Sequence, residues 1–335
     1  MQSASSTFRF ISGLLFCFAT ILIVLSSGSS EAASPSERPV YVIVRNNELN
    51  LLPKALSLSC VEGVTIYWSW RSIEKVKDQP DFNGLIDAVK EAQAVGKKVN
   101  IAILPGLWSP NWLSAQGVKY MNWSHTDNYV DNVNGKPSSA PVPWDATYLA
   151  NFTALIRKFL PALAPFKNIN SVAVTGPSNT NGLEAAVISA DEQLRAHNYS
   201  DKSFISAWLE MAKTFSQDLP DTTLTVALHE QIGSAKRPAV SRELSRELRE
   251  LLGERYVPML LGFEGKGWFN ERNGYAGLII NHGQAQGALQ AIKIYSKSND
   301  VSGFRSMVQR SNSLRPRWLE IWAADALDKQ YFQCQ

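Results

Sequence analysis

The sequence predicts an α/β fold, a (β/α)8 TIM barrel in a single domain, and two observations favour it. Short apolar runs rich in β-branched residues recur along the chain, and amphipathic, helix-like stretches separate them. Continuous apolar runs that alternate with helices are typical of parallel strands covered by helices. The roughly 300 residues that follow the N-terminal segment are also a common size for one such barrel.

Eight runs are expected to form the strands, at residues 40–44, 63–68, 98–104, 171–176, 223–228, 257–263, 277–280 and 318–322. The run at 277–280 is weak, so the sixth and seventh strands are the least clearly defined. A long segment at 105–143, rich in Trp, Asn, Ser and Pro, follows the third run. We expect this segment to lie on the face where barrel loops build active sites, and the barrel domain to span residues 36–335.

The N-terminal segment has the features of a secretory signal. Arg9 precedes an apolar run at residues 10–25, and Ser30 and Ala32 fit the small-x-small pattern of a cleavage site. The sequence therefore predicts a signal peptide over residues 1–32 and a secreted, periplasmic or extracellular protein. The alternative is an uncleaved membrane anchor through residues 10–25, although this run is short for a full span.

The composition excludes several classes of partner and cofactor. A net charge of +3, without basic runs interleaved with aromatics, gives no reason to expect nucleic acid, and membrane contact is expected only if the N-terminal segment stays uncleaved. The four histidines form no H-E-x-x-H or H-x-H arrangement, so no metal is expected. Neither a G-x-S-x-G elbow nor a phosphate-binding G-x-x-x-x-G-K-[ST] loop occurs, and we expect no cofactor.

Two cysteines remain after signal removal, Cys60 and Cys334. A pair of cysteines in an exported protein can oxidise, so these two are a candidate disulfide. The alternative is two unrelated buried thiols. Cys60 lies just before the second predicted strand, at the bottom of the barrel, where a C-terminal Cys334 can reach it.

Residues at the carboxyl ends of barrel strands point into one shared mouth, so they are the candidate site residues. Carboxylates and tryptophans dominate these positions, which are Trp70, Arg71, Glu74, Trp108, Trp112, Glu184, His229, Glu230, Glu264, Glu320 and Asp325. Indole faces pack on the apolar face of a pyranose, and two carboxyl groups can serve as acid and nucleophile across a glycosidic bond. The combination therefore indicates a carbohydrate ligand or substrate.

One stretch carries a family resemblance: "YWSWRSIEKVKDQPDFNGLIDAVKEAQAVGKKVNIAILPGLWSPNWL", residues 67–113. It resembles the front half of clan A (β/α)8 glycoside hydrolases, most of all the β-galactosidase type, of which this chain would be a divergent member. The later "VPWDATYLANFTALIRKF" (142–159) is similar to the clan's entry to the third helix. The resemblance covers residues 60–184 well and the remainder loosely.

The resemblance implies an acid/base Glu at the end of strand four, usually preceded by Asn, and a nucleophilic Glu at the end of strand seven. Glu184 lies in the first region, but Leu183 precedes it and it lies eight residues beyond Gly176, which departs from the pattern. Glu264, between Phe263 and Gly265, is the candidate nucleophile, and Glu320 and Glu230 are its rivals. The alternative for each is a salt-bridged carboxylate at a strand end.

Substrate contacts are expected from Trp70, Arg71, Trp108, Trp112 and Trp268, and from Glu320 if it is not the nucleophile. Arg71 can hold a carboxylate of the site ionised by charge proximity, and an ion pair with Glu74 is the alternative. The main functional hypothesis is an exported glycoside hydrolase with two catalytic carboxyl groups, Glu184 and Glu264. The alternatives are an inactive barrel that binds sugars or serves a structural role, and a membrane-anchored surface protein of unrelated function.

Overall fold

The computed structural model describes residues 38–123, 138–265, 275–281 and 284–334. Eight parallel strands form a closed ring and confirm the predicted (β/α)8 barrel, since β10 pairs with both β13 and β8. In ring order they are β1 (Val40–Arg45), β2 (Gly63–Ser69), β3 (Lys98–Leu104), β6 (Ile169–Ala173), β8 (Thr223–Ile232), β10 (Tyr256–Phe263), β13 (Ala288–Ala291) and β14 (Leu319–Trp322).

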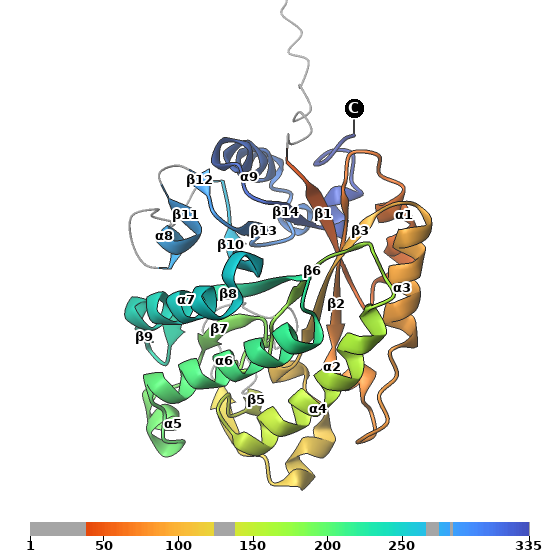
Figure 1. The fold of residues 1–335 in the computed structure, drawn as a ribbon. Helices are drawn as coiled ribbons and strands as arrows, with labels where there is room; N and C mark the ends of the chain where they lie inside the picture. The colour runs from red at the N-terminus through yellow and green to blue at the C-terminus, as the bar shows by residue number, and fades with distance from the viewer. Residues whose placement is uncertain (1–37, 124–137, 266–274, 282–283, 335) are drawn as a thin grey trace, which may run out of the picture. The chain divides into compact units, whose positions relative to one another are not determined.

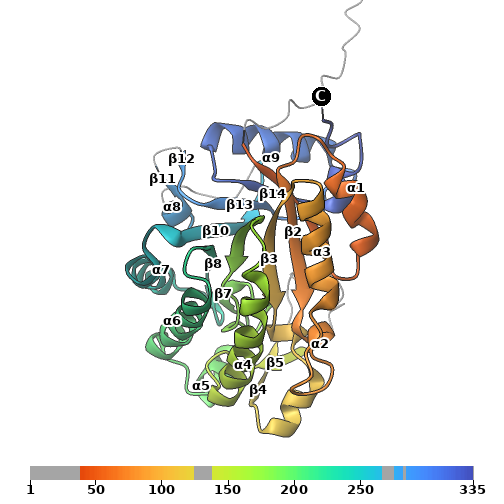
Figure 2. The ribbon, with the colours of Figure 1, turned by 45° about the vertical axis from the view of Figure 1, so that its right-hand side comes forward.

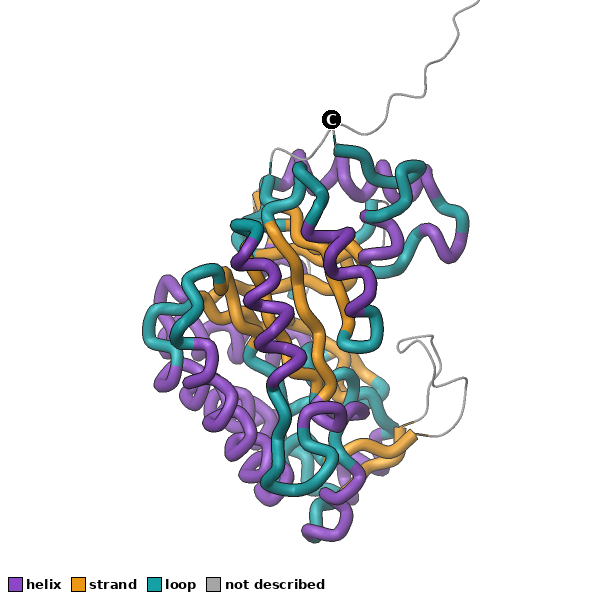
Figure 3. The backbone as a smooth tube through the Cα atoms, turned by 90° about the vertical axis from the view of Figure 1, so that its right-hand side faces the viewer, coloured by secondary structure: helices purple, strands orange, loops and turns teal. Residues whose placement is uncertain are grey.

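Helices cover the outside of this ring (Figures 1 and 2). The long ones are α3 (Asn83–Ala94), α4 (Ala146–Leu163), α6 (Asp201–Asp218), α7 (Pro238–Leu252) and α9 (Val301–Leu314). The shorter ones are α1 (Leu52–Leu56), α2 (Trp70–Ile73), α5 (Asp191–Ala196), α8 (Ala276–Ile279) and α10 (Ala323–Ala326). Figure 3 shows the strands enclosed by the helices. In the part of the chain described here, no helix is both long and apolar enough to cross a membrane.

Alternate residues of each strand divide the apolar core in two, because successive side chains point to opposite faces. Outward residues such as Val42, Ile66 and Leu260 pack against the helices. Inward residues such as Tyr41, Ala102 and Met259 fill the barrel. The barrel interior is mainly apolar, so the polar side chains inside it need hydrogen-bond partners or a functional role.

The prediction is wrong for the seventh strand. Residues 277–280 lie mostly in the short helix α8, with Ile280 starting β11 (Ile280–Asn281), which pairs with β12 (Gln284–Ala285). The seventh barrel strand is β13, four residues of sequence ALQA. Pairing with β10 on one side and β14 on the other holds this short strand in the ring, so its position is fixed by long-range contacts.

The segment at 105–143 follows β3, as predicted. Its described part contains the turns η2 (Gly106–Trp108) and η3 (Asn111–Gln116), and an antiparallel pair, β4 (Tyr120–Trp123) with β5 (Ser138–Pro141). In Figure 2 these elements lie with α2 and α5 at the lower end, which the carboxyl ends of β2 and β3 face. We call this end of the barrel the mouth.

Cys60 and Cys334 form a disulfide in the structure, with their Cα atoms 5.1 Å apart. Cys60 lies three residues before the start of β2, at the end of the barrel opposite the mouth. The bond ties the last described residue of the chain to the base of the second strand. The predicted signal peptide at 1–32 lies outside the described residues.

Candidate active site

Glu184 reaches the mouth through an excursion in the fourth strand. The chain leaves β6 after Ala173, turns through residues 174–183, and returns as β7 (Glu184–Val187). Ala227 of β8 pairs with Met259 of β10 and also with Glu184, so β10 and β7 lie on opposite edges of β8. β6 and β7 therefore share one edge, and β7 continues the path of the fourth strand.

The pairing also fixes the direction of the Glu184 side chain. Ala227 faces the barrel interior, and paired residues of neighbouring strands point to the same face. Because Ala173 pairs with Thr225, Glu184 takes the next inward position toward the mouth. The seven residues between Gly176 and Glu184 belong to the excursion, so this departure from the clan A pattern still leaves Glu184 on the path of strand four, toward its carboxyl end.

Side chains and backbone inside the excursion hold it rigidly. Asn179 uses both ends of its amide on Ile188, donating to the carbonyl oxygen and accepting from the N–H at 2.8 Å each. Asn181 Oδ1 accepts from the N–H of Leu183 at 2.9 Å, and the N–H of Gly176 donates to the carbonyl oxygen of Gly182 at 2.9 Å. These bonds hold the buried loop, in which the Thr175 hydroxyl has no hydrogen-bond partner among the residues that the structure describes, and they fix the backbone that leads into Glu184.

Burial dominates the electrostatics of Glu184. The residue is only 6% exposed, and loss of water raises the pKa of its carboxyl to about 8. Glu184 in turn raises the pKa values of Tyr67 and Tyr275 further above the range set by burial. Ionised Glu184 would therefore act on both hydroxyls, and burial favours the protonated form of the carboxyl.

Tyr67, near the end of β2, lies beside a second buried carboxyl group. The hydroxyl of Tyr67 donates to Gln290 Oε1, and it lies 3.5 Å from Glu320 Oε2. Glu320, inside β14, is 2% exposed, and burial raises its pKa to about 7 against the opposing effect of its hydrogen bonds. The structure thus gathers Glu184, Tyr67, Gln290 and Glu320 at the mouth and just beneath it.

An aromatic and a cation border this group. Trp322, the last residue of β14, packs its ring edge-on to Tyr67 and donates from Nε1 to the carbonyl oxygen of Ala291 at 3.0 Å. The guanidinium of Arg45 lies 5.6 Å from the centre of the Trp322 ring. Tyr67, Gln290 and Trp322 were not selected from the sequence. Tyr67 and Trp322 are inward positions of strands that were predicted, so the alternation of facing along a strand points to them. Gln290 lies on β13, which was not predicted.

Glu264 lies at the end of the sixth strand, directly after β10. Its carbonyl oxygen accepts from Arg310 of α9 at 3.2 Å, and its charge raises the pKa of Tyr295, which packs on Phe304 of the same helix. The guanidinium of Arg310 also lies 5.8 Å from the centre of the Phe263 ring. The backbone at the carboxyl end of β10 is therefore anchored to α9.

The predicted tryptophan contacts fall into three groups. Trp70 has no exposed surface, donates to Glu74 Oε2 at 2.8 Å and packs against Phe152, so it is a core residue in this structure. Trp112 is half-buried, packs edge-on to Trp70 and donates to the Glu74 carbonyl oxygen at 2.9 Å. Trp108 is half-buried at the rim, and Trp268 lies outside the described residues.

Within the described residues, Arg71 contacts the rim of the mouth and no carboxylate. Its guanidinium donates to the carbonyl oxygen of Leu107 and lies 5.3 Å from the centre of the Trp108 ring. The oxygens of Glu74 are bonded instead to Trp70 and to the N–H of Asp78. Arg71 therefore stiffens the segment after β3 and covers one part of Trp108.

Two further groups face Tyr275 near the mouth. His229 packs on its ring at a centroid distance of 5.3 Å, and burial lowers the pKa of His229 to about 4, so the imidazole is neutral. Glu230 adds to the raised pKa of Tyr275 and pairs with Lys236 Nζ at 3.0 Å. Glu230 thus fits the salt-bridged alternative. In the described part of the chain no cluster of His, Cys, Asp and Glu is suited to a metal ion.

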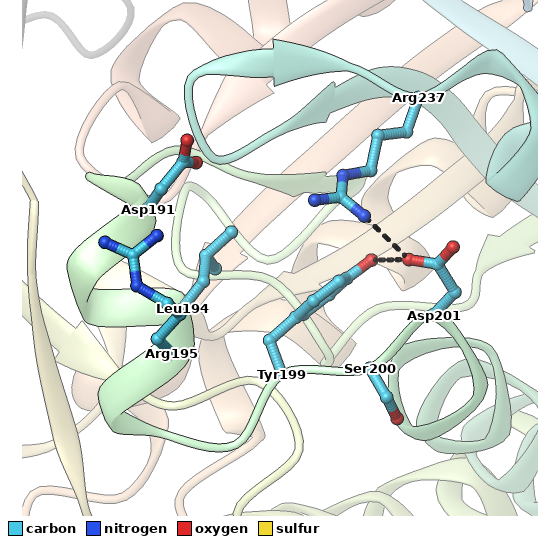
Figure 4. Close-up of a pocket in the computed structure, with 7 residues that line it drawn as sticks. All are labelled: Asp191, Leu194, Arg195, Tyr199, Ser200, Asp201 and Arg237. Carbon is cyan, nitrogen blue, oxygen red and sulfur yellow. Dashed lines mark hydrogen bonds and ion pairs between the residues drawn. The ribbon is translucent and has the colours of Figure 1, made fainter.

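A separate pocket of about 460 Å³ lies between α5, the start of α6 and the residue before α7 (Figure 4). Tyr199 and Arg237 both donate to Asp201 Oδ1, at 2.8 and 3.2 Å, as the figure shows. Arg195 pairs with Glu192 at 3.0 Å. Since these charges are already paired with one another, the mouth is the stronger candidate for a site.

Comparisons with solved structures confirm the barrel fold of this chain. No family model matches the sequence, and no curated protein matches it. Among solved structures, the catalytic domain of β-amylase from Paenibacillus polymyxa is similar at a TM-score of 0.58 and 10% identity, covering 90% of this chain and 96% of that one. The chain has the same barrel fold.

Xylanase 10B from Thermotoga maritima is similar at a TM-score of 0.51 and 11% identity, covering 84% of this chain and 82% of that one. Xylanase 10B from Thermotoga petrophila, solved with xylobiose, is similar at a TM-score of 0.50 and 11% identity, over 84% and 81% of the two chains. At such identities the likeness shows the fold alone. The function must be argued from the mouth.

Proposed function

We propose that the chain is an exported glycoside hydrolase in which Glu184 donates the proton to the leaving oxygen. The observation that carries this proposal is the position of Glu184: an inward carboxyl at the carboxyl end of strand four, with a pKa raised by burial to about 8. A general acid must hold its proton at the working pH, and a buried carboxyl in a barrel mouth does so. The fold shared with β-amylase and the xylanases supports a carbohydrate substrate.

The reaction needs a second carboxyl group on the other side of the anomeric carbon. In the proposed mechanism Glu184 protonates the glycosidic oxygen while the carboxylate of Glu264 attacks the anomeric carbon. Water then hydrolyses the glycosyl-enzyme, and Glu184 takes back a proton. Trp322 and Trp108, both half-buried at the end of the barrel that holds Glu184, are the proposed platforms for the sugar rings.

The test is hydrolysis of a panel of nitrophenyl glycosides by the chain that begins at Ala33. On any glycoside that the wild type cleaves, Glu184→Gln is expected to lower kcat/KM by about 10²- to 10⁴-fold, the usual contribution of a general acid. Glu264→Gln is expected to lower it as well. Glu192→Gln, which changes an exposed carboxylate of α5, is the matched control and should leave kcat/KM unchanged.

Full activity of Glu184→Gln would refute the proposal. A loss in Glu184→Gln without a loss in Glu264→Gln would instead assign the second carboxyl to another residue, with Glu320→Gln as the next variant. Export is tested separately by mass spectrometry of the secreted chain, which should begin at Ala33. A chain that keeps residues 1–32 would support the membrane-anchored alternative.

A second function, sugar binding without turnover, is favoured by the residue on strand seven. The clan A resemblance implies a Glu at the end of that strand, but the last inward residue of β13 is Gln290. An amide cannot attack an anomeric carbon as a carboxylate does. Binding of xylobiose or maltose measured by calorimetry, with no hydrolysis of any glycoside in the panel, would favour this binding protein over the hydrolase.

A further inference from the structure

Glu320 is a buried carboxyl group that the proposed reaction does not use, and it lies inside the barrel directly below Tyr67. Three donors converge on its Oε1: the Thr65 hydroxyl at 2.8 Å, the Asn100 amide at 3.1 Å and the Trp318 indole at 3.1 Å. Among the described residues, its Oε2 has one hydrogen-bonding neighbour, the Tyr67 hydroxyl at 3.5 Å. The two oxygens of one carboxyl group therefore have different surroundings.

The orientation of Asn100 is fixed from below. Its Oδ1 accepts from Asn170 at 2.8 Å and from Ser171 at 2.7 Å, so its Nδ2 must point to Glu320 and Thr65. The indole of Trp318 can only donate. A proton on Oε1 would therefore face at least two N–H donors. When Glu320 is neutral, its proton belongs on Oε2, next to the Tyr67 oxygen.

This placement sets the direction of the next hydrogen bonds. A neutral Glu320 would donate from Oε2 toward the Tyr67 oxygen, 3.5 Å away, and Tyr67 then gives its single proton to Gln290 Oε1, which is the bond present in the structure. An ionised Glu320 accepts instead, so Tyr67 must donate downward to Oε2. The Tyr67 oxygen is then left to accept, and only the NH₂ end of the Gln290 amide can donate to it.

We propose that Glu320 is a positioning residue: its protonation decides, through Tyr67, which end of the Gln290 amide faces Tyr67 and which end faces the barrel mouth. A neutral Glu320 leaves the Gln290 NH₂ free for a ligand acceptor, and an ionised Glu320 leaves the carbonyl oxygen free for a ligand donor. The consequence for a sugar rests on the proposed function, whereas the change in hydrogen-bond direction does not.

The groups around Glu320 leave it close to half-ionised at neutral pH. Facing it are Tyr41 of β1, Thr65 and Tyr67 of β2, Asn100 of β3, Gln290 of β13 and Trp318 next to β14, with Glu184 of β7 acting on Tyr67 from the mouth. None of these is a cation. Burial therefore raises the pKa of Glu320 while the donors limit the rise, to about 7.

The test reads the side-chain NH₂ of Gln290 by ¹⁵N–¹H NMR without any ligand, with the signal assigned by its loss in Gln290→Met. In the wild type this signal should titrate with a midpoint near pH 7. In Glu320→Gln and in Tyr67→Phe the same titration should disappear. Thr65→Val removes one donor to the ionised carboxyl and leaves Tyr67 in place, so the midpoint should move to higher pH.

A titration that persists in Glu320→Gln or Tyr67→Phe would overturn the proposal, as would a wild-type signal that stays constant from pH 5.5 to 8.5. If Glu320→Gln does not fold, Thr65→Val and Tyr67→Phe still test the proposal. If Glu320 had only a structural role, Thr65→Val would not shift the midpoint of the Gln290 titration. No sugar and no turnover enter this measurement. The proposed role of Glu320 can therefore be refuted in a protein that hydrolyses glycosides, and supported in a protein that does not.

Discussion

The fourth and seventh strands of the barrel reach the mouth in opposite ways. Strand four is split, and a ten-residue excursion brings Glu184 into the inward position that follows Ala173. Strand seven is four residues long and ends its inward face with Gln290. One strand therefore presents an ionisable group whose proton is held by burial, and the other an amide whose direction depends on its neighbours.

This difference shows that the two sides of the mouth are not equivalent halves of a two-carboxylate site. Strand four presents a carboxyl group although the strand is irregular. Its irregular part is a buried loop whose polar groups need hydrogen-bond partners. Strand seven is regular but lacks the carboxyl. The three changes below test whether strand four is built around Glu184 and whether strand seven tolerates a carboxyl.

Glu184→Gln is expected to give the largest change in stability at alkaline pH. The folded pKa of Glu184, about 8, lies above its ordinary value of 4.5, so the folded state binds a proton that the unfolded state has released. Stability must then fall as pH rises from about 4.5 to 8. Gln cannot ionise, so the variant should be more stable than wild type at pH 8.5 by at most about 5 kcal/mol.

Urea unfolding at pH 5 and pH 8.5 measures this effect. Glu320 also makes stability fall as pH rises, over a narrower pH range, because its folded pKa is about 7. The stability of Glu184→Gln should therefore still fall with pH, but less steeply than that of the wild type. Glu192→Gln, at an exposed site, should follow the wild-type curve. Equal slopes in wild type and Glu184→Gln would mean that Glu184 is not held neutral by burial.

Gly106→Ala should cost the next largest amount, because Gly106 supports the excursion from strand three. A Cβ at Gly106 would lie 2.4 Å from the carbonyl oxygen of Thr180 and 2.9 Å from that of Ser178, both within the excursion. Gly96 also has a positive φ, 70° against 60°, but a Cβ there meets nothing within 4 Å. The pair of alanine variants therefore separates crowding from backbone conformation.

We expect Gly96→Ala to lower the free energy of unfolding by about 1 kcal/mol, the cost of a left-handed conformation. Gly106→Ala should cost roughly 3 kcal/mol or more, since two backbone carbonyls must move. Thermal melting of the two variants gives the comparison. Equal losses would show that the excursion can shift away from Gly106 and does not hold Glu184 rigidly.

The regular part of the fold could be predicted from the sequence because buried parallel strands read as continuous apolar runs. The β3 run at 98–104 was predicted with its observed bounds, and β1, β2 and β10 within a residue. β13 was missed because "ALQA" has no β-branched residue and is too short to stand out. Its place depends on β10 and β14, which lie far away in the sequence.

The site was harder to predict than the fold. Glu184 was selected from its region, but its alignment with strand four depends on pairing with β8, which local sequence does not encode. Trp70 was expected at the site because it follows a strand, yet it turns outward into the helix-facing core with Phe152. Tyr67, three residues before Trp70 and still within β2, points inward to Glu320 and Gln290.

Gln290→Glu should give the smallest of the three stability changes, and it tests the seventh strand directly. Gln290 pairs in register with Glu320 and accepts from Tyr67, so the new carboxyl would lie beside an existing buried one. Two neighbouring carboxyls cannot both ionise cheaply, which raises the pKa of at least one of them above its unfolded value. The variant should therefore lose stability as pH rises, by about 1–3 kcal/mol more at pH 8 than at pH 5.

Gln290→Met is the matched control, because it removes the bond to Tyr67 without adding a charge and should cost about 1 kcal/mol at both pH values. Urea unfolding of both variants separates the charge from the lost bond. A Gln290→Glu protein with no extra loss at pH 8 would show that strand seven accommodates a carboxylate, which would weaken the contrast with strand four. Hydrolysis of nitrophenyl glycosides that appears or rises in Gln290→Glu would go further, since it would assign the second carboxyl position to strand seven and leave Glu264 a structural residue beside α9.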